Sequence, residues 1–123
     1  MDATSPLRTV NDIKEAYKKF SKSNSSNLFS VTNSNRSPYF NMVEIKNSKV
    51  QLVKQAKKQY LRRQDTPVTY DLNASIYIWK RKSLIKNKKL IQNKTNIYVM
   101  PKSRSIDIDD KFDFKIVSEL LKK

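Results

Sequence analysis

The chain contains no glycine, and this absence limits both its turns and the ways in which it can bind phosphate. Average proteins contain about 7% glycine. Glycine-rich turns let most nucleotide-binding folds bring backbone N–H groups against phosphates, so a phosphate loop of that kind is excluded. Cysteine and histidine are also absent. Disulfides, Cys or His metal sites, thiol nucleophiles and an imidazole base are therefore excluded as well.

The length of 123 residues predicts one small domain, because a core of ordinary size needs roughly 100 to 150 residues. The hydrophobic content of 37% is enough for a packed core. No apolar run approaches the ~20 residues that span a bilayer. Residues 1–6 lack the basic and apolar regions of a signal peptide. We therefore expect a cytosolic location and no membrane partner.

The formal net charge is +15, from 26 Lys and Arg against 11 Asp and Glu. Such a balance is typical of proteins with polyanionic partners. The lysines are scattered along the chain, which is equally typical of solvated faces without a binding role. One alternative is a small basic nucleic-acid-binding protein, favoured by the interleaved aromatic and basic residues of 77–82. The acids of residues 105–109 weigh against it, because they would repel phosphate unless a metal intervened.

Helical and strand patterns alternate along the chain. Helical spacing covers residues 9–20 and 110–122, with a shorter helix at 83–90. Strand patterns cover residues 28–32, 42–45, 50–53, 74–79 and 96–100. Residues 2–8 have the pattern of a strand end that leads into a loop. Residues 54–69 carry many charges and are expected to form an extended segment. The alternation predicts an α/β layered fold.

Both long helices carry an apolar stripe behind a start signal. Thr9 is an expected N-cap, with Asp12 three residues later, and the stripe consists of Val10, Ile13, Tyr17 and Phe20. The last helix begins with the Asp110 to Asp113 signal, and its stripe consists of Phe114, Val117, Leu120 and Leu121. Such stripes are typical of helices that pack on a core.

Asp107 and Asp109 are two positions apart in the run Ser-Ile-Asp-Ile-Asp. In an extended segment, such side chains point to the same side and can converge on one hard cation. Magnesium is the candidate, because one or two carboxylates commonly hold it while substrate phosphates supply other ligands. The alternative is that Asp109 and Asp110 only cap the following helix.

Four strings in this order resemble the acylneuraminate cytidylyltransferases, the CMP-sialic acid synthetases. They are Asp-Ala-Thr-Ser-Pro-Leu-Arg at 2–8, Arg-Gln-Asp-Thr-Pro at 63–67 with Tyr-Asp-Leu-Asn-Ala-Ser-Ile-Tyr-Ile at 70–78, Tyr-Val-Met-Pro at 98–101, and Ser-Ile-Asp-Ile-Asp at 105–109. Four ordered matches are far more specific than any one of them. The resemblance extends over essentially the whole chain and covers about the second half of a full-length member.

The resemblance implies a three-layer α/β/α nucleotidyltransferase fold, incomplete at its N-terminus, in a single domain. Residues 33–70 would form the extension through which two protomers pair as a homodimer. The implied reaction is attack by the anomeric hydroxyl of a nine-carbon 2-keto acid sugar on the α-phosphate of CTP. Its products would be a CMP-sugar and pyrophosphate.

The resemblance also implies roles for residues near the chemistry. Asp107 and Asp109 would bind Mg²⁺, which neutralises the phosphates and orients the displacement. Asp2 stands where many members have a glutamine that contacts the sugar. Arg8 closes the Thr-Ser-Pro-Leu-Arg turn beside the site as a catalytic residue.

Further implied roles concern the sugar. Arg63 matches an arginine of the extension that lies near the sugar carboxylate of the partner protomer, and Gln64 adjoins it. A charged bidentate donor suits that role, although a solvated charge is the alternative. Tyr70, Asn73 and Tyr77 match the segment that lines the sugar pocket, where amides and hydroxyls can bind sugar hydroxyls. For Tyr77, core packing is the favoured alternative.

The chain departs from the family in three places. Asn73-Ala74 stands where the family usually has Asn-Gly, so the backbone there loses some freedom. Tyr39 and Phe40 follow Pro38, where many members carry a lysine two positions after the proline. The N-terminal loop with glycine and lysine that grips the CTP triphosphate has no counterpart here. We therefore expect a fragment that is inactive by itself, with a preceding partner strand missing.

Overall fold

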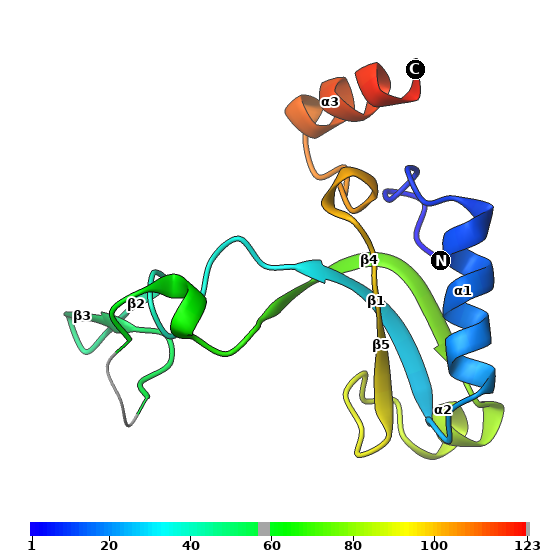
Figure 1. Cartoon of the computed structure of the whole chain (residues 1–123), viewed down its shortest axis with the longest axis horizontal. Helices are drawn as coiled ribbons and strands as arrows, with labels where there is room; N and C mark the ends of the chain where they lie inside the picture. The colour runs from blue at the N-terminus through cyan, green and yellow to red at the C-terminus, as the bar shows by residue number, and fades with distance from the viewer. Residues whose placement is uncertain (57–59, 123) are drawn as a thin grey trace. The chain divides into compact units, whose positions relative to one another are not determined.

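The computed structural model describes residues 1–56 and 60–122. Its regular elements, in chain order, are α1 (Val10–Ser21), β1 (Asn27–Asn33), β2 (Val43–Lys46), β3 (Lys49–Leu52), β4 (Tyr70–Trp79), α2 (Arg81–Lys86), β5 (Thr95–Val99) and α3 (Lys111–Leu121) (Figure 1). Short 3-10 turns occupy Arg63–Asp65 and Lys102–Arg104. Two compact units result: Met1–Thr32 with Leu72–Lys123, and Asn33–Asp71.

The first unit is built on a three-stranded sheet in the order β4-β1-β5. β1 and β5 are parallel, with Leu28 opposite Asn96 and Val31 opposite Val99. The backbone N–H of Lys80, just after β4, donates to the Ser26 carbonyl, just before β1, at 3.0 Å. The end of β4 therefore lies beside the start of β1, so these two strands run antiparallel. The sequence prediction of an α/β fold is confirmed at this level.

The hydrophobic core lies where α1 packs on this sheet. Ala16, Leu28, Ile76 and Met100 form its buried cluster, and Ile13, Phe20, Ile78 and Tyr98 pack against it. β1 is buried along most of its length, as expected for the central strand of a sheet with a parallel pair. The predicted buried strand at 28–32 is therefore confirmed, with one more residue at each end.

Helix α1 begins as the sequence predicts, but a different face is buried. Thr9 and Asp12 form a capping box. Ala16 is fully buried, whereas Val10 and Tyr17 are 68% and 62% exposed. The predicted stripe is therefore wrong for these two residues, because positions 10 and 17 lie at the rim of the helix face centred on Ala16. The buried face also includes the charged residue Asp12.

Helix α3 likewise begins as predicted, with Asp110 as the N-cap of a capping box that includes Asp113. Its predicted apolar stripe is largely exposed: Val117 is buried, but Phe114 is 60% exposed and Leu121 is also exposed. The prediction that the whole stripe packs on a core is wrong for the described chain.

Three other predictions need correction. Residues 2–8 form turns and irregular backbone, and no strand. The helix predicted at 83–90 is α2, which begins at Arg81 and ends at Lys86. The strand predicted at 74–79 is longer at its start, because β4 begins at Tyr70.

Within β4, Ala74 adopts φ 49°, in the left-handed region that favours glycine. This is the position at which the cytidylyltransferases usually have glycine. The Cβ of alanine costs about 1 to 2 kcal/mol in this conformation.

The second unit contains the hairpin of β2 and β3, which pair antiparallel with Ile45 opposite Val50. Asn47 and Ser48 form its turn, with φ 52° and 59°. Two consecutive positive φ values are typical of a type I′ turn, which suits the twist of a hairpin. The pairing predicted from sequence is confirmed. Val43, Ile45 and Val50 are exposed, so the hairpin presents apolar side chains to solvent.

Among the residues that the structure describes, none of the helices has the length and apolarity required to cross a membrane.

Candidate functional site

The candidate site begins in the N-terminal loop, which Arg8 holds closed. The Arg8 Nη1 donates to the carbonyl oxygens of Asp2, at 2.7 Å, and Ser5, at 2.6 Å. The Ser5 side chain is fully buried, and its Oγ donates to the carbonyl oxygen of Asn73 at 3.4 Å. The backbone N–H of Ile108 donates to the Thr4 carbonyl at 2.9 Å. The loop therefore joins β4 to the segment that carries Asp107.

Asn73 is the centre of a buried polar network. Its Oδ1 accepts from the Ser30 Oγ at 2.6 Å, and its Nδ2 donates to the Ser105 Oγ at 3.0 Å and the Met100 Sδ at 3.4 Å. Ser105 in turn donates to the Pro101 carbonyl at 2.8 Å. The Asn73 side chain is buried, so in this structure it holds the 100–105 backbone against β1. Its predicted contact with a sugar stays a prediction.

An ion pair between the buried Asp12 carboxylate and the partly exposed Arg104 guanidinium anchors the same segment to α1. The Arg104 Nε and Nη2 donate to the two carboxylate oxygens of Asp12, at 2.9 and 2.8 Å. Tyr98 donates to Asp12 at 3.3 Å, and the Thr9 hydroxyl donates at 2.7 Å. Burial raises the pKa of Asp12, but hydrogen bonds from Arg104 and Thr9 outweigh it and hold that pKa well below its usual range. Asp12 is therefore ionised and fixes the position of Arg104.

The sequence did not predict that Arg104, Tyr98 and Ser105 hold the segment before Asp107 in place through hydrogen bonds. Asp12 was recognised only as part of the helix start, and it is 92 residues away from its ion-pair partner. No local pattern signals a pair at that separation. Asp12 also lies outside the apolar stripe that the sequence predicts, so its burial appears only in the structure.

The network places Asp107 directly after the Asn73 and Arg104 anchors. Asp107 is half-buried, and its Oδ1 is buried without a hydrogen-bond partner among the described residues. Partial burial raises the pKa of Tyr77, and the negative charges of Asp2 and Asp107 raise it further. Asp2, Tyr77 and Asp107 therefore share one region of the first unit. Tyr77 is 36% exposed and lies outside the core cluster, so its favoured core-packing role is wrong.

Asp109 and Asp110 differ in their contacts. The Asp110 Oδ1 accepts from the backbone N–H groups of Phe112 and Asp113, at 2.7 and 2.9 Å. Asp109 is exposed, and its backbone N–H donates to Asp113 at 3.2 Å. The capping role that the sequence left open is thus confirmed for Asp110, whereas the Asp109 carboxylate is not the cap.

The remaining predicted residues belong to the second unit. Arg63 and Gln64 line a cavity of about 430 Å³ together with Ser34, Arg36 and Thr69, among others. The Arg63 Nη2 donates to the Ser34 carbonyl at 3.2 Å. Tyr70 is exposed.

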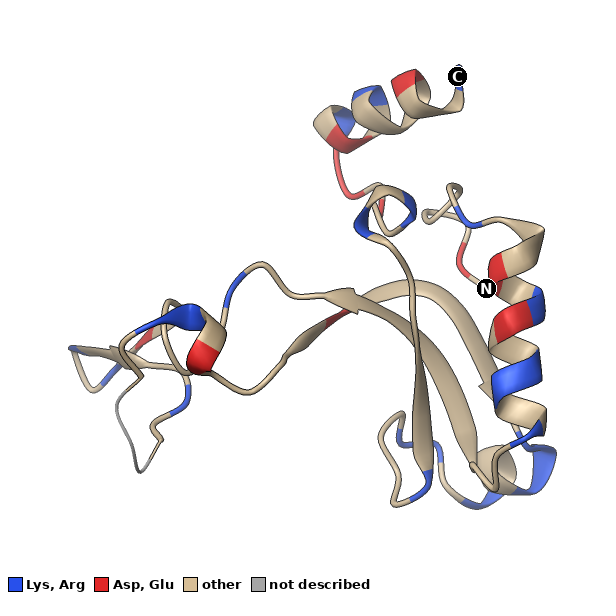
Figure 2. Cartoon of the chain, viewed as in Figure 1, with Lys and Arg blue, Asp and Glu red and all other residues tan. Residues whose placement is uncertain are grey.

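Figure 2 shows the acidic residues around the segment that leads into α3, whereas α2 and the loop before β5 carry basic residues. Asp107 follows β5, which is parallel to β1. Ligands of open α/β sheets commonly bind outside the carboxyl ends of parallel strands. The fold and the site thus define an α/β protein with a carboxylate-bearing site after a parallel strand.

Comparison with known proteins shows which α/β proteins this chain is similar to. No family profile matches the chain. The chain is 39% identical over its whole length to the "Post-translational flagellin modification protein B" of Campylobacter coli and covers 52% of it. It is 46% identical over 94 residues to the "CMP-N,N'-diacetyllegionaminic acid synthase" of Campylobacter jejuni, a match to 76% of this chain and 39% of that protein.

An "N-acylneuraminate cytidylyltransferase" of Streptococcus agalactiae is 32% identical over 115 residues, 93% of this chain and 27% of its own length. The chain therefore spans about half the length of these relatives, or less. We identify it as a partial-length homologue of proteins named as an N-acylneuraminate cytidylyltransferase and a CMP-N,N'-diacetyllegionaminic acid synthase.

Proposed function

We propose that this chain supplies the metal- and sugar-binding part of a nucleotidyltransferase that transfers CMP from CTP to a sialic-acid-like nonulosonic acid. The observation that carries the proposal is the half-buried Asp107, whose Oδ1 has no hydrogen-bond partner among the described residues. Two relatives, named as a CMP-N,N'-diacetyllegionaminic acid synthase and an N-acylneuraminate cytidylyltransferase, support it.

The donor set fits a magnesium ion. Among the described residues, no three or more His, Cys, Asp or Glu side chains are arranged so that they could hold a metal ion together. Mg²⁺ needs only one or two carboxylates, however, when phosphates supply other ligands. Asp107 and Asp109 would hold it, and its buried, unpartnered oxygen makes Asp107 the stronger ligand. When bound, Mg²⁺ would supply charge neutralisation for the transferred phosphate group.

The chain's own residues would bind and orient the sugar for in-line attack. In the proposed reaction, the anomeric hydroxyl attacks the α-phosphorus of CTP, and pyrophosphate leaves. The Arg63 guanidinium lines the cavity of the second unit beside Gln64. In the proposed homodimer, its fork of N–H donors would bind the carboxylate of the sugar held by the partner protomer. Asp2 and Tyr77, near Asp107, would contact sugar hydroxyls.

We assign Asn73 and Arg8 supporting roles in this proposal. Asn73 fixes Ser105, and Arg8 closes the 2–8 loop through two carbonyl contacts. Both keep the backbone around Asp107 in place. The complete enzyme in this proposal has three α/β/α layers, acts in the cytosol and forms a homodimer through residues 33–70.

The test is pyrophosphate release from CTP with a panel of nonulosonic acids and Mg²⁺. The assay is run on this chain alone and on a chimera in which the chain replaces its matching segment of the Campylobacter jejuni relative. We expect activity in the chimera. Asp107→Ala in the chimera should lower kcat about 100-fold or more, since metal-mediated charge stabilisation is worth several kcal/mol.

Glu119→Ala is the matched control, because Glu119 is an exposed acid of α3 that pairs with Lys122; this variant should keep full activity. Circular dichroism establishes that the chimera is folded. A folded chimera that is inactive with every sugar would contradict the proposed reaction. Full turnover in Asp107→Ala would contradict the metal role alone.

A further inference from the structure

A second polar hollow of about 660 Å³ lies in the first unit, at the end of β5 away from Asp107. Lys86, Lys89 and Lys94 line it, with the Ser26 and Ser83 side chains and Ile91 among its other walls. Ser26 immediately precedes β1, and Lys94 immediately precedes β5. We call this feature the lysine hollow.

The lysine hollow has strong positive charge and no acidic neighbour in its own part of the sequence. Between Asp71 and Asp107 the chain has nine Lys and Arg and no Asp or Glu. Among the described residues, the ion pairs are those of Lys18, Arg104 and Lys122, so Lys86, Lys89 and Lys94 have no acidic partner. Three uncompensated ammonium groups around one hollow repel one another, and an anion would relieve this repulsion.

The backbone of the lysine hollow is held by hydrogen bonds. The Gln92 Nε2 donates to the carbonyls of Asn87 and Lys89, at 2.9 and 3.1 Å. The buried Asn27 donates from its Nδ2 to the Leu90 carbonyl at 2.6 Å and accepts from Thr95 at 2.8 Å. The Ser26 N–H donates to the Lys94 carbonyl at 2.8 Å. The loop that carries two of the lysines is therefore fixed to the sheet, which lowers the entropy cost of binding.

We propose that the lysine hollow binds a phosphate-bearing anion. Lysine ammonium groups bind phosphate as point charges, and the serine hydroxyls can donate further hydrogen bonds. Ile91 lines the hollow yet is 72% exposed. The anion can therefore be a free polyphosphate or the phosphate of a lipid headgroup, whose acyl region Ile91 would meet.

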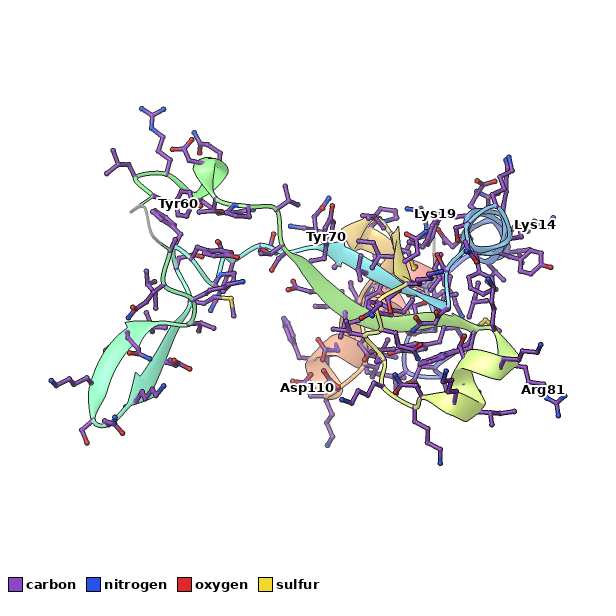
Figure 3. The ribbon with its side chains drawn as sticks, turned by 90° about the horizontal axis from the view of Figure 1, so that it is seen from below. Lys14, Lys19, Tyr60, Tyr70, Arg81 and Asp110 are labelled. Atoms are coloured by element: carbon purple, nitrogen blue, oxygen red, sulfur yellow. The ribbon has the colours of Figure 1, made fainter. Side chains whose placement is uncertain are left out.

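The experiment measures binding of inorganic pyrophosphate to this chain by calorimetry, in magnesium-free buffer at physiological salt. A second arm measures co-sedimentation with phosphatidylglycerol vesicles. The test variant is the triple change Lys86→Gln, Lys89→Gln and Lys94→Gln. The matched control is Lys14→Gln, Lys19→Gln and Lys22→Gln, which removes the same charge from exposed positions in and after α1. Figure 3 shows Lys14 and Lys19 projecting from α1 and Arg81 from α2.

We expect the test variant to bind about tenfold or more weakly than the control, because the loss of three ammonium–phosphate contacts weakens binding by a modest factor at each position. Loss of pyrophosphate binding identifies a free anion as the ligand, and loss of vesicle binding alone identifies a lipid headgroup. Equal binding by the two triple variants, or no binding in either arm, would overturn the proposal. Absence of CMP transfer would leave this result unaffected, because the assay contains neither CTP nor sugar.

Discussion

Asp12 shows how one buried residue positions the candidate site. Its carboxylate receives hydrogen bonds from Arg104, Tyr98 and Thr9. Because Arg104 directly precedes Ser105, this ion pair fixes the start of the segment with Asp107. Asn73 fixes the same segment from the side of the sheet. Two independent anchors therefore limit how far the carboxylate of Asp107 can move.

We expect Asp12→Asn to destabilise the chain by about 2 kcal/mol at pH 7, because it removes the charged acceptor of the hydrogen bonds from Arg104. The folded-state pKa of Asp12 is lowered from its ordinary 3.8. Its contribution is therefore fully present above pH 3.8 and is lost as the pH falls below that value. Urea unfolding at pH 7 and pH 3 should show a smaller difference between wild type and variant at pH 3.

Glu15→Gln is the control for this prediction. Glu15 lies on the same helix and forms an exposed pair with Lys18 at 3.7 Å, so its loss should change the free energy of unfolding by less than about 1 kcal/mol. A difference between wild type and Asp12→Asn that does not vary with pH would contradict the assigned pKa direction.

Ala74 gives a second prediction at the scale of one residue. Its φ of 49° is free of steric cost only for glycine. Ala74→Gly should raise the free energy of unfolding by up to about 1 kcal/mol, because relief of 1 to 2 kcal/mol of strain exceeds the added entropy of the unfolded chain. Thermal unfolding of the wild type and the variant measures this change in the free energy of unfolding. The control is Ala16→Gly in α1, which should destabilise; a loss of stability in Ala74→Gly would contradict the strain.

At the scale of elements, helix starts are determined locally and helix faces are not. Thr9 and Asp110 each begin a capping box, as the sequence predicts. The exposed sides of the same helices carry Tyr17 and Phe114, which the sequence assigns to apolar stripes. Hydrogen bonds of a cap join residues three apart, whereas burial depends on which distant segment covers the helix.

The two neighbouring acids before α3 give an element-scale prediction. Asp110→Ala should lower the free energy of unfolding by about 1 kcal/mol, because it removes the N-cap acceptor. Asp109→Ala should change that free energy by less than about 0.5 kcal/mol, because only its backbone N–H is engaged. Chemical unfolding of both variants, monitored by the circular dichroism of the helices, compares their free energies of unfolding. Equal losses in both would contradict the assignment of the cap to Asp110.

At the scale of the whole molecule, the sequence predicts one domain, while the contacts divide the described chain into two compact units. The second unit, Asn33–Asp71, nearly matches the predicted extension at residues 33–70; its role in dimer formation stays a prediction. The net charge of +15 is divided unevenly. The lysine hollow lies at the start of β5, and the carboxylates of Asp107 and Asp109 lie beyond its end.

The sequence by itself determined the starts of α1 and α3, the hairpin and the approximate positions of β1 to β5, because capping, turn geometry and side-chain alternation act over a few residues. It also predicted the resemblance to the acylneuraminate cytidylyltransferases, because four ordered strings match. Only the tertiary structure decided that Asp12 holds Arg104, that Asn73 is a buried support and that three lysines surround one hollow. These relationships join residues far apart in the chain, and the packing of α1, β1, β4 and β5 alone brings them together.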